Sequence, residues 1–474
     1  MKQPFPIHVI LGLLIAVCTL SVVGCKPEQD SSETSPVSSA PQQVTLHVLT
    51  VDDEVFAPLI KRYWTAEGNL EPVVTNVSST DFLATDFQLP DDCDVIVFPT
   101  SQFVELVTRN RLAEISSELL DKFDYRKETV FSHLKTELPQ INRATFAVPL
   151  GSPQMCLMYR NDILQGLGID APSSWDEFRE LLQTRQQADS KLDLVLLEPL
   201  AGDWAAHSFL TRVASRVRGA GRISTLIDVE TAKPLIGGEP FVSTLQEMVE
   251  QYPQAPSEFL APADVFRAIC DGKAEIALGW PSVNFDALSS ESSQQIRIAR
   301  VPGSKRWYDP SNSRWFDRDD DGQTYFDYIG FEGRMAGISK NSRYLEEATR
   351  FAAWLSGNEA SRKIGIESNA TSIYRSSQMG AASAWAGDAL SDEAALQYFE
   401  ALMDSNRDRL CFLFPRVPNQ ADYVSSLAEA VRSALTREKT VESALATAAE
   451  KWSELIEKTG VDEVRKWTLA GENF

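Results

Sequence analysis

The sequence predicts an α/β fold of two lobes followed by a helical C-terminal portion. Three observations predict it: apolar runs of strand length alternate with helical periodicity from residue 44, the alternation restarts after Gly151, and the last third of the 474 residues is mostly helical in pattern. Runs that are apolar throughout are typical of strands in parallel sheets covered by helices. Each lobe is therefore expected to hold a mostly parallel sheet flanked by helices.

The first lobe is expected to begin abruptly at Val44, where an apolar strand follows a polar stretch. Short links join its elements, in the order of a doubly wound α/β unit. The expected strands are Val44–Thr50, Val73–Val77, Cys93–Phe98 and Phe146–Leu150, with helices over Glu54–Glu67 and Phe103–Asn110.

The second lobe is expected to begin with a strand over Met155–Tyr159. A helix opens at Ser174, because Ser174 and Glu177 have the spacing of a capping box. Further strands are expected at Leu192–Leu197 and Glu275–Gly279. The C-terminal third predicts helices over Leu345–Leu355, Asp392–Met403, Ala421–Leu435 and Val441–Lys458.

The N-terminus has the pattern of a bacterial lipoprotein signal. Lys2 precedes an apolar run that begins near Ile7 and ends in Val22-Val23-Gly24-Cys25. Cleavage after Gly24 would leave Cys25 as the lipidated first residue. A single membrane-spanning helix is the alternative interpretation. We therefore expect a signal peptide over residues 1–24 and a protein anchored by lipid to a bacterial membrane, in the periplasm or at the cell surface.

Residues 25–43 are rich in serine and proline and have almost no apolar side chains. Such a segment cannot bury a core, so it is expected to be a flexible linker between the lipid and the folded lobes. The formal net charge of −22 repels phosphate backbones, which argues against nucleic acid as a partner. Outside the leader and Cys25, four cysteines remain, and the sequence does not decide between disulfides and buried thiols: Cys93, Cys156, Cys270 and Cys411.

Signals for catalysis are poor. The four histidines are far apart, and the sequence has no HExxH pattern, no Gly-x-Ser-x-Gly elbow, no Walker loop and no CxxC pair. We expect no catalytic residue and no cofactor. Acidic side chains are so numerous that residue types alone do not exclude a glycosidase, which is kept as an alternative.

Four segments, in order along the chain, resemble the extracellular solute-binding proteins of ABC importers, in the class of maltose-binding protein. The first runs from a strand ending in Val-Pro to a Gly-Ile-x-x-Pro-x-Ser-Trp-x-Glu-Phe pattern, and the second is a Gly-Lys-Ala strand ending in tryptophan. The four segments, in order, are Phe146–Gly151 with Leu157–Asp162 and Gly168–Phe178; Asp271–Trp280; Val301–Ser304 through Ala336–Lys340 to Trp354–Ser356; and Val441–Leu445 with Trp452.

This resemblance implies a periplasmic-binding-protein fold of type II, with two hinged lobes that close on a small solute, most simply a carbohydrate. It implies lobe one over residues 44–150 plus 299–350, and lobe two over 151–298 plus 351–474. It also implies membrane subunits of an ABC importer as partners, a monomer, and binding without catalysis. An exported carbohydrate-active hydrolase and a scaffold lipoprotein without a ligand are the alternatives.

A sugar site needs aromatic platforms and carboxylate or amide acceptors. Trp280 matches the tryptophan that lines the cleft in this family, with core packing as the alternative. Trp204 follows another predicted strand, and Asp203 and Glu198 would supply acceptors beside it. Trp315, in an irregular stretch, is a further candidate platform.

On the first lobe, polar side chains follow two predicted strands. Asp52 and Asp53 come after the first, and Ser101 and Gln102 come after the third. They could bind hydroxyl groups at the carboxyl edge of the sheet, although N-capping of the next helix is the alternative. The resemblance adds three candidates that line the cleft in relatives: Gly151, Ser152 and Tyr374.

The segment Asp317-Arg318-Asp319-Asp320-Asp321-Gly322 resembles the start of a calcium loop, with Asp317, Asp319 and Asp321 as oxygen ligands. Position twelve is Tyr328 and not the glutamate that such loops require. A solvated acidic turn is the alternative, and no other metal site is expected.

Overall fold

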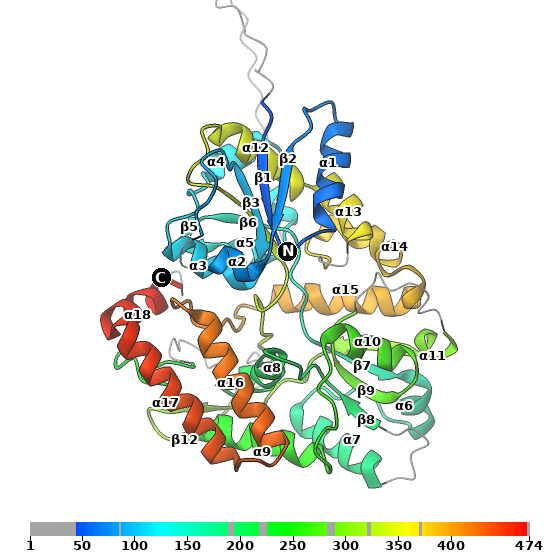
Figure 1. The fold of residues 1–474 in the computed structure, drawn as a ribbon. Coiled ribbons are helices and arrows are strands. Elements are labelled where there is room, and N and C mark those ends of the chain that lie inside the picture. The colour runs from blue at the N-terminus through cyan, green and yellow to red at the C-terminus, as the bar shows by residue number, and fades with distance from the viewer. Residues whose placement is uncertain are drawn as a thin grey trace, which may run out of the picture. The chain divides into compact units, whose positions relative to one another are not determined.

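The computed structural model describes residues 44–84, 87–187, 194–217, 225–281, 290–319, 324–368 and 372–471. The chain divides into two compact units, residues 1–42 and 43–474, and the described residues belong to the second (Figure 1). The expected signal peptide, Cys25 and the linker lie outside the described residues. None of the helices in the described ranges has the length and apolar character needed to cross a membrane.

The first sheet has the strand order β2–β1–β3–β13–β6. The pairs β1–β2 and β1–β3 are parallel, and β13 is antiparallel to both of its neighbours. All apolar residues of β3 are buried, as expected for a central strand covered on both faces. The strands are β1 His47–Val51, β2 Val73–Val77, β3 Val95–Pro99, β6 Ala147–Pro149 and β13 Arg334–Ile338.

Short helices follow the strands of the first sheet and bury their apolar sides against it. In α1, for example, the buried residues Phe56, Ile60 and Trp64 recur at helical spacing. The elements are α1 Phe56–Ala66, α2 Ser79–Leu83, η1 Thr100–Gln102, α3 Phe103–Thr108, α4 Ser117–Lys122, η2 Lys127–Thr129 and α5 Ser132–Thr136, with a small ribbon of β4 Gln140–Ile141 and β5 Ala144–Thr145.

The second sheet has the strand order β10–β7–β9–β8. Only β8–β9 is a parallel pair, whereas β7 is antiparallel to β9 and β10. The two-lobed α/β fold class is confirmed, but both sheets are mixed rather than mostly parallel. The cause is that β7 and β13 are each reached by a chain segment that crosses from the other sheet, and not by a helical βαβ connection within one sheet. The strands are β7 Cys156–Arg160, β8 Leu194–Leu197, β9 Ala274–Gly279 and β10 Ile296–Arg300.

Helix α8, Trp204–Val217, is the centre of this half of the molecule. Every described residue from Ala205 to Val217 is buried, because α9, α16 and the β11–β12 ribbon all pack against it. The other helices and strands of this half are α6 Asn161–Leu167, α7 Trp175–Gln187, α9 Glu239–Gln251, α10 Pro262–Cys270, α11 Glu291–Gln294, β11 Arg306–Asp309 and β12 Arg314–Asp317.

The C-terminal part is helical, as expected. Helix α15 packs along β10, and α16 packs against both α17 and α8 (Figure 1). Its elements are α12 Leu345–Leu355, α13 Asn358–Glu367, η3 Ser376–Ala381, α14 Ala382–Ala386, η4 Gly387–Ala389, α15 Asp392–Arg407, α16 Gln420–Leu435, α17 Val441–Thr459 and α18 Val461–Gly471.

The lobe ranges stay a prediction, and three observations bear on their limits. Strand β10 continues to Arg300 in the second sheet, so the expected limit at residue 299 falls inside a strand. Helix α12 packs on β13 and α13 packs on α1, next to the first sheet. The β11–β12 ribbon, in contrast, packs on α8.

The four cysteines left open by the sequence, Cys93, Cys156, Cys270 and Cys411, are buried thiols in the structure. Burial raises the pKa of the Cys93 thiol to about 12, which keeps it protonated and unreactive at neutral pH.

Candidate functional site

The structure contains a cavity of about 510 Å³. Its walls come from loops and helices next to both sheets. Its lining includes side chains that follow β3, side chains from the start of α8 and α16, and residues just before β13. The lining residues are Ser79, Leu83, Ser101, Gln102, Glu105, Arg109, Asp203, Trp204, His207, Phe331, Glu332, Asn419, Gln420, Ala421, Asp422 and Val424. Of the sequence-predicted residues, Ser101, Gln102, Asp203 and Trp204 are among them.

Asp203 and Trp204 reach the cavity because α8 begins there. The Asp203 Oδ1 atom accepts a hydrogen bond of 2.8 Å from the Ser425 hydroxyl of α16, and Arg432 donates to the Gly202 carbonyl. These contacts join the start of α8 to the side of α16. Trp204 is half-buried, so part of its ring is open to a ligand.

Three aromatic rings pack together at one side of the cavity. The centroid of Trp204 lies 5.3 Å from that of Trp280 and 6.3 Å from that of Phe331, and Trp280 and Phe331 are 5.6 Å apart. Trp204 and Phe331 line the cavity, whereas Trp280 is only 8% exposed and is not part of the lining. The structure therefore places Trp280 behind the platform, where it supports the other two rings.

Glu332 stands at the cavity because two chain crossings pack together tightly. Gly333, with φ +116°, approaches the Gly151 carbonyl so closely that a Cβ would lie 2.2 Å from its oxygen. The Ser152 hydroxyl donates to the Glu332 carbonyl at 3.2 Å, and its N–H donates to Ser372 Oγ. Gly151 and Ser152 thus shape the cavity from behind and do not line it.

Burial raises the pKa of the Glu332 carboxyl, and Arg334, 3.7 Å away between Nη1 and Oε1, opposes this shift. A partly desolvated carboxylate is a strong hydrogen-bond acceptor. Glu332 thus brings a half-buried carboxyl group, beside Arg334, to the cavity wall.

On the side of the first sheet, Ser101 is exposed and Gln102 is 6% exposed. The Gln102 Nε2 atom donates to Ser79 Oγ at 2.6 Å, and Gln102 Oε1 is buried without a partner among the described residues. Arg109 is held by Glu105 through a 2.5 Å ion pair and donates to the Leu83 carbonyl. The cation in this wall is thus already neutralised.

Asp52 and Asp53 hold backbone instead of lining the cavity. Asp53 Oδ1 accepts from the Phe56 N–H at the start of α1, and its Oδ2 accepts from Arg334 Nε at 3.0 Å. Asp52 Oδ1 accepts from the Ser79 N–H at 2.9 Å. The capping alternative that the sequence left open fits these contacts.

Glu198 lies in a buried ion pair beneath α8. Its two oxygens accept from Arg212, at 3.0 and 3.1 Å, and Tyr252 donates to Oε1 at 2.8 Å. Both carboxylate oxygens of Glu198 are thus engaged within the protein, and Glu198 is not among the residues that line the cavity. Tyr374 is also buried, and its hydroxyl donates to the Ser356 carbonyl at 3.4 Å.

Trp315 lies on β12, opposite Tyr308 of β11, with their ring centroids 5.5 Å apart. The guanidinium of Arg306 lies over its ring. Trp315 is not among the residues that line the cavity.

For the calcium candidate, Asp317 ends β12 and Asp319 is exposed, while Asp321 lies outside the described residues. Within the described ranges, no three His, Cys, Asp or Glu side chains gather so that they could hold a metal ion. The calcium site stays a prediction.

Sequence reasoning missed Ser79, Leu83, Glu105 and Arg109, which line the cavity on the side of the first sheet. Near α8 it also missed His207, Phe331, Glu332 and the start of α16. Among these, a signal existed only for His207, which is three residues after Trp204 and so on the same face of a helix. The other residues near α8 reach the site through crossings between the lobes, and local sequence patterns do not report these.

The cavity suits a neutral, polar ligand with apolar faces. Two long helices, α8 and α16, begin at it, and each carries its own carboxylate in Asp203 or Asp422, which offsets the positive end of the helix. A wall of aromatic rings beside acceptors is the composition of a binding pocket for a small solute. The fold and this pocket together define a two-lobed solute-binding protein.

The comparison with protein families agrees with that class. Residues 49–362 match the family described as bacterial extracellular solute-binding protein. The match covers well over half of the chain, and the chain belongs to this family.

Solved structures with the same fold include a maltose-bound protein, a sugar-binding protein and an ABC transporter solute-binding protein. MalE3 of T. maritima with maltose bound is 19% identical, with a TM-score of 0.61 over 87% of this chain and 99% of its own. An ABC transporter solute-binding protein of Agrobacterium radiobacter K84 in complex with ribitol is 16% identical, with a TM-score of 0.64 over 87% and 98%. The sugar-binding protein MalE of Xanthomonas citri is 16% identical, with a TM-score of 0.66 over 88% and 98%.

Proposed function

We propose that this chain is the substrate-binding lipoprotein of an ABC importer and that it captures a sugar or polyol between its two lobes. The observation that carries the proposal is the cavity wall of Trp204 and Phe331 beside the carboxylates of Asp203 and Glu332. Aromatic faces pack against the C–H faces of a sugar, and carboxylates accept hydrogen bonds from its hydroxyl groups. The ligand is bound and released unchanged, without a covalent step.

The charges of the cavity support a neutral ligand over an anion. Arg109 is already paired with Glu105, and the carboxylates of Asp203, Glu332 and Asp422 would repel a negatively charged ligand. The maltose and ribitol named for two structural relatives are neutral compounds of the proposed class.

The expected binding cycle is a hinged closure of the lobes on the solute, followed by delivery to the membrane subunits of the importer. A monomer is sufficient, because the cavity is built from a single chain. The lobe ranges 44–150 plus 299–350 and 151–298 plus 351–474 belong to this proposal, with their exact limits to be set by ligand-bound structures.

The lipid anchor at Cys25 is the second part of the proposal. It supports a position on the periplasmic or outer side of a bacterial membrane, where the family name places its members. Lys26 follows the cysteine, a pattern that resembles lipoproteins directed to the outer membrane. Metabolic labelling with palmitate is expected to mark the wild type and to fail in Cys25→Ala. Equal labelling of both would contradict the anchor.

A thermal-shift screen tests the ligand class, with mono- and oligosaccharides, polyols, amino acids and anions as compounds. A true ligand stabilises the folded state by about 2.7 kcal/mol at a hundredfold excess over the dissociation constant. We expect hits among sugars or polyols, and products are then checked by chromatography. Hits among amino acids or anions alone would contradict the carbohydrate assignment, and cleavage products would support a hydrolase. A screen without any hit would favour a scaffold lipoprotein.

A further inference from the structure

His207 lies in the cavity wall with its ring enclosed by three aromatic side chains. The centroid of its imidazole is 5.5 Å from that of Trp204, 5.4 Å from that of Phe331 and 5.7 Å from that of Tyr328. The residue is buried, yet it is one of the residues that line the cavity. Its ring is therefore fixed in orientation while one edge meets the ligand space.

The two ring nitrogens have different surroundings. Nδ1 is 3.1 Å from the hydroxyl oxygen of Tyr328. Nε2 has no hydrogen-bond partner among the described residues, and it is not one of the buried side-chain atoms left unpaired there. By elimination, Nε2 is the nitrogen at the cavity.

The protonation of His207 follows from two observations. Burial lowers its pKa to about 3, so the imidazole is neutral at physiological pH and carries one N–H. The Tyr328 hydroxyl is buried, and the described residues offer it no hydrogen-bond partner other than His207. A buried O–H that lacks an acceptor is costly, so Tyr328 donates to Nδ1 and the proton of the imidazole lies on Nε2.

Tyr328 itself is held by the crossings between the lobes. It forms an isolated bridge with Phe412, and the next residue, Ile329, donates its N–H to the Phe412 carbonyl at 3.0 Å. The tyrosine thus acts as a fixed brace that sets both the orientation and the tautomer of His207.

We propose that His207 determines ligand specificity by donating its Nε2–H to one oxygen atom of the solute packed on Trp204, with Tyr328 as its positioning residue. This inference rests on the proposed carbohydrate function and deepens it. Beside Trp204 the side chain of Asp203 is an acceptor, so a fixed donor at His207 selects a hydroxyl, ring or glycosidic oxygen at that point. A solute with an ammonium group there is rejected, because two donors would face each other.

The binding test uses isothermal titration of the full chain with maltose and with ribitol. His207→Leu keeps the approximate size and removes the donor, so we expect affinity to fall about tenfold or more, as for the loss of one buried hydrogen bond. His207→Gln keeps an N–H donor and is expected to retain affinity within a few-fold. The affinity of Tyr328→Phe should lie between the affinities of the two His207 variants. His47→Gln, at a half-buried position of β1 that does not line the cavity, is the matched control.

A second measurement reads the protonation of the His207 ring directly. The sequence has only four histidines, so ring ¹⁵N chemical shifts in a histidine-labelled chain can be assigned by comparison with His207→Gln and His47→Gln. We expect His207 to show a protonated Nε2 and an unprotonated Nδ1 at pH 7, and only Nε2 to shift when maltose or ribitol binds.

The outcomes separate this inference from the proposed function. Wild-type affinity in His207→Leu, or a proton found on Nδ1, would overturn the role of His207 while leaving carbohydrate binding intact. Absence of any carbohydrate binding by the wild type would overturn the proposed function, and this inference with it.

Discussion

Trp204 and Trp280 show how the surroundings of a side chain decide its role. Both follow predicted strands, and both were candidates for the ligand platform. Their rings are in contact, but Trp204 is half-open at the cavity while Trp280 is 8% exposed behind it. The two residues should therefore respond differently to truncation.

We expect Trp204→Ala to weaken binding of the solute found in the screen by about tenfold or more, with a small loss of stability. The reason is that stacking contributes ~0.5–1.5 kcal/mol beyond the area it buries. Trp280→Ala should instead lower the free energy of unfolding by about 3–5 kcal/mol, as for other buried aromatic residues. Titration calorimetry and urea denaturation of both variants measure this. A stable Trp280→Ala variant that has lost binding would contradict the assignment.

The pKa of His207 links this residue to the acid stability of the protein. The ordinary value of 6.5 applies to the unfolded chain, whereas burial lowers the pKa of the folded state to about 3. Between these values the unfolded state binds one proton more, so the free energy of unfolding falls as the pH falls from 6.5 toward 3. The contribution is at most ~1.4 kcal/mol per pH unit.

Urea denaturation at pH 7, 5.5 and 4.5 tests this contribution. Stability should decline less steeply in His207→Gln than in the wild type, while His47→Gln should follow the wild type. His133, whose pKa is also lowered by burial, is present in all three proteins and does not affect the comparison. If the free energy of unfolding fell with pH equally steeply in the wild type and in His207→Gln, the lowered pKa of His207 would be contradicted.

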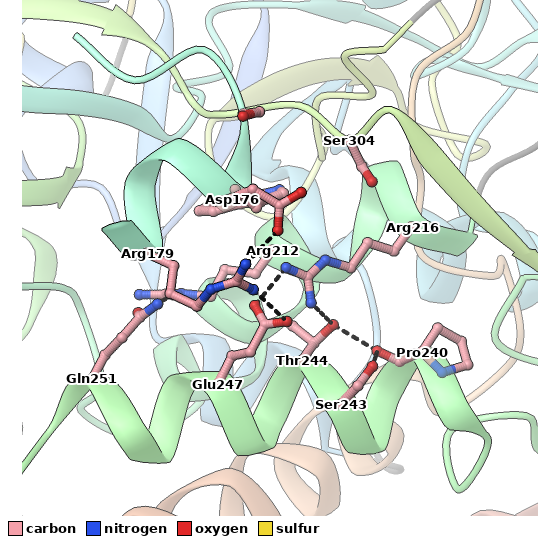
Figure 2. A network of polar contacts seen from close by, with 12 residues as sticks. Asp176, Arg179, Arg212, Arg216, Pro240, Ser243, Thr244, Glu247, Gln251 and Ser304 are labelled. Carbon is pink, nitrogen blue, oxygen red and sulfur yellow. Dashed lines mark hydrogen bonds and ion pairs between the residues drawn. The ribbon is translucent and has the colours of Figure 1, made fainter. Parts of the chain in front are cut away.

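At the scale of elements, α8 connects the cavity to a buried polar network. Figure 2 shows Arg216 donating to Thr244 Oγ1 and to Glu247, at 2.9 and 2.6 Å, with Arg179 on the other side of Glu247. One turn earlier, Arg212 donates to Glu198 and to Gln251. These contacts fix the helix that presents Asp203, Trp204 and His207.

Glu198→Gln is expected to destabilise the protein by about 3–5 kcal/mol, because it leaves the Arg212 charge buried without its carboxylate. Glu454→Gln, at an exposed position of α17, should change stability by less than about 0.5 kcal/mol. Chemical denaturation of the two variants provides the measurement. If Glu198→Gln were as stable as the control, α8 would not depend on this pair.

At the scale of the whole molecule, the crossings between the two sheets form the back of the site. The first passes through Gly151 and Ser152, the second through Phe331 and Glu332, and the third follows α15. Near this third crossing, Arg300 donates to both Asp327 and Asp408. The crossings therefore carry part of the cavity wall.

Gly333→Ala tests the close packing of the first two crossings. Its Cβ would meet the Gly151 carbonyl, and φ +116° is unfavourable for alanine, so we expect lower stability and weaker binding through displacement of Glu332. Gly380→Ala is the matched control, because a Cβ there meets open space. Thermal unfolding and ligand titration are compared, and wild-type behaviour of Gly333→Ala would show that the crossings tolerate a shift.

The sequence by itself determined the two α/β lobes, several of their strands and helices, the C-terminal helices and the family. These follow from hydrophobic periodicity, capping signals and ordered motifs, which are local properties of the chain. It also identified the positions after strands and at helix starts that carry Asp203, Trp204, Ser101 and Gln102, because the carboxyl ends of strands meet at one edge of a sheet.

Only the tertiary structure decided which polar groups are free to meet a ligand. Glu198 and Asp53 are good acceptors by type, but buried arginines engage them from distant segments. Trp280 is covered by rings that come from α8 and from the crossing before β13. His207 and Glu332 acquire their roles from contacts made 121 and 180 residues away in the chain, with Tyr328 and Ser152. Local patterns do not encode such long-range contacts, since these depend on how the two sheets and their crossings pack together.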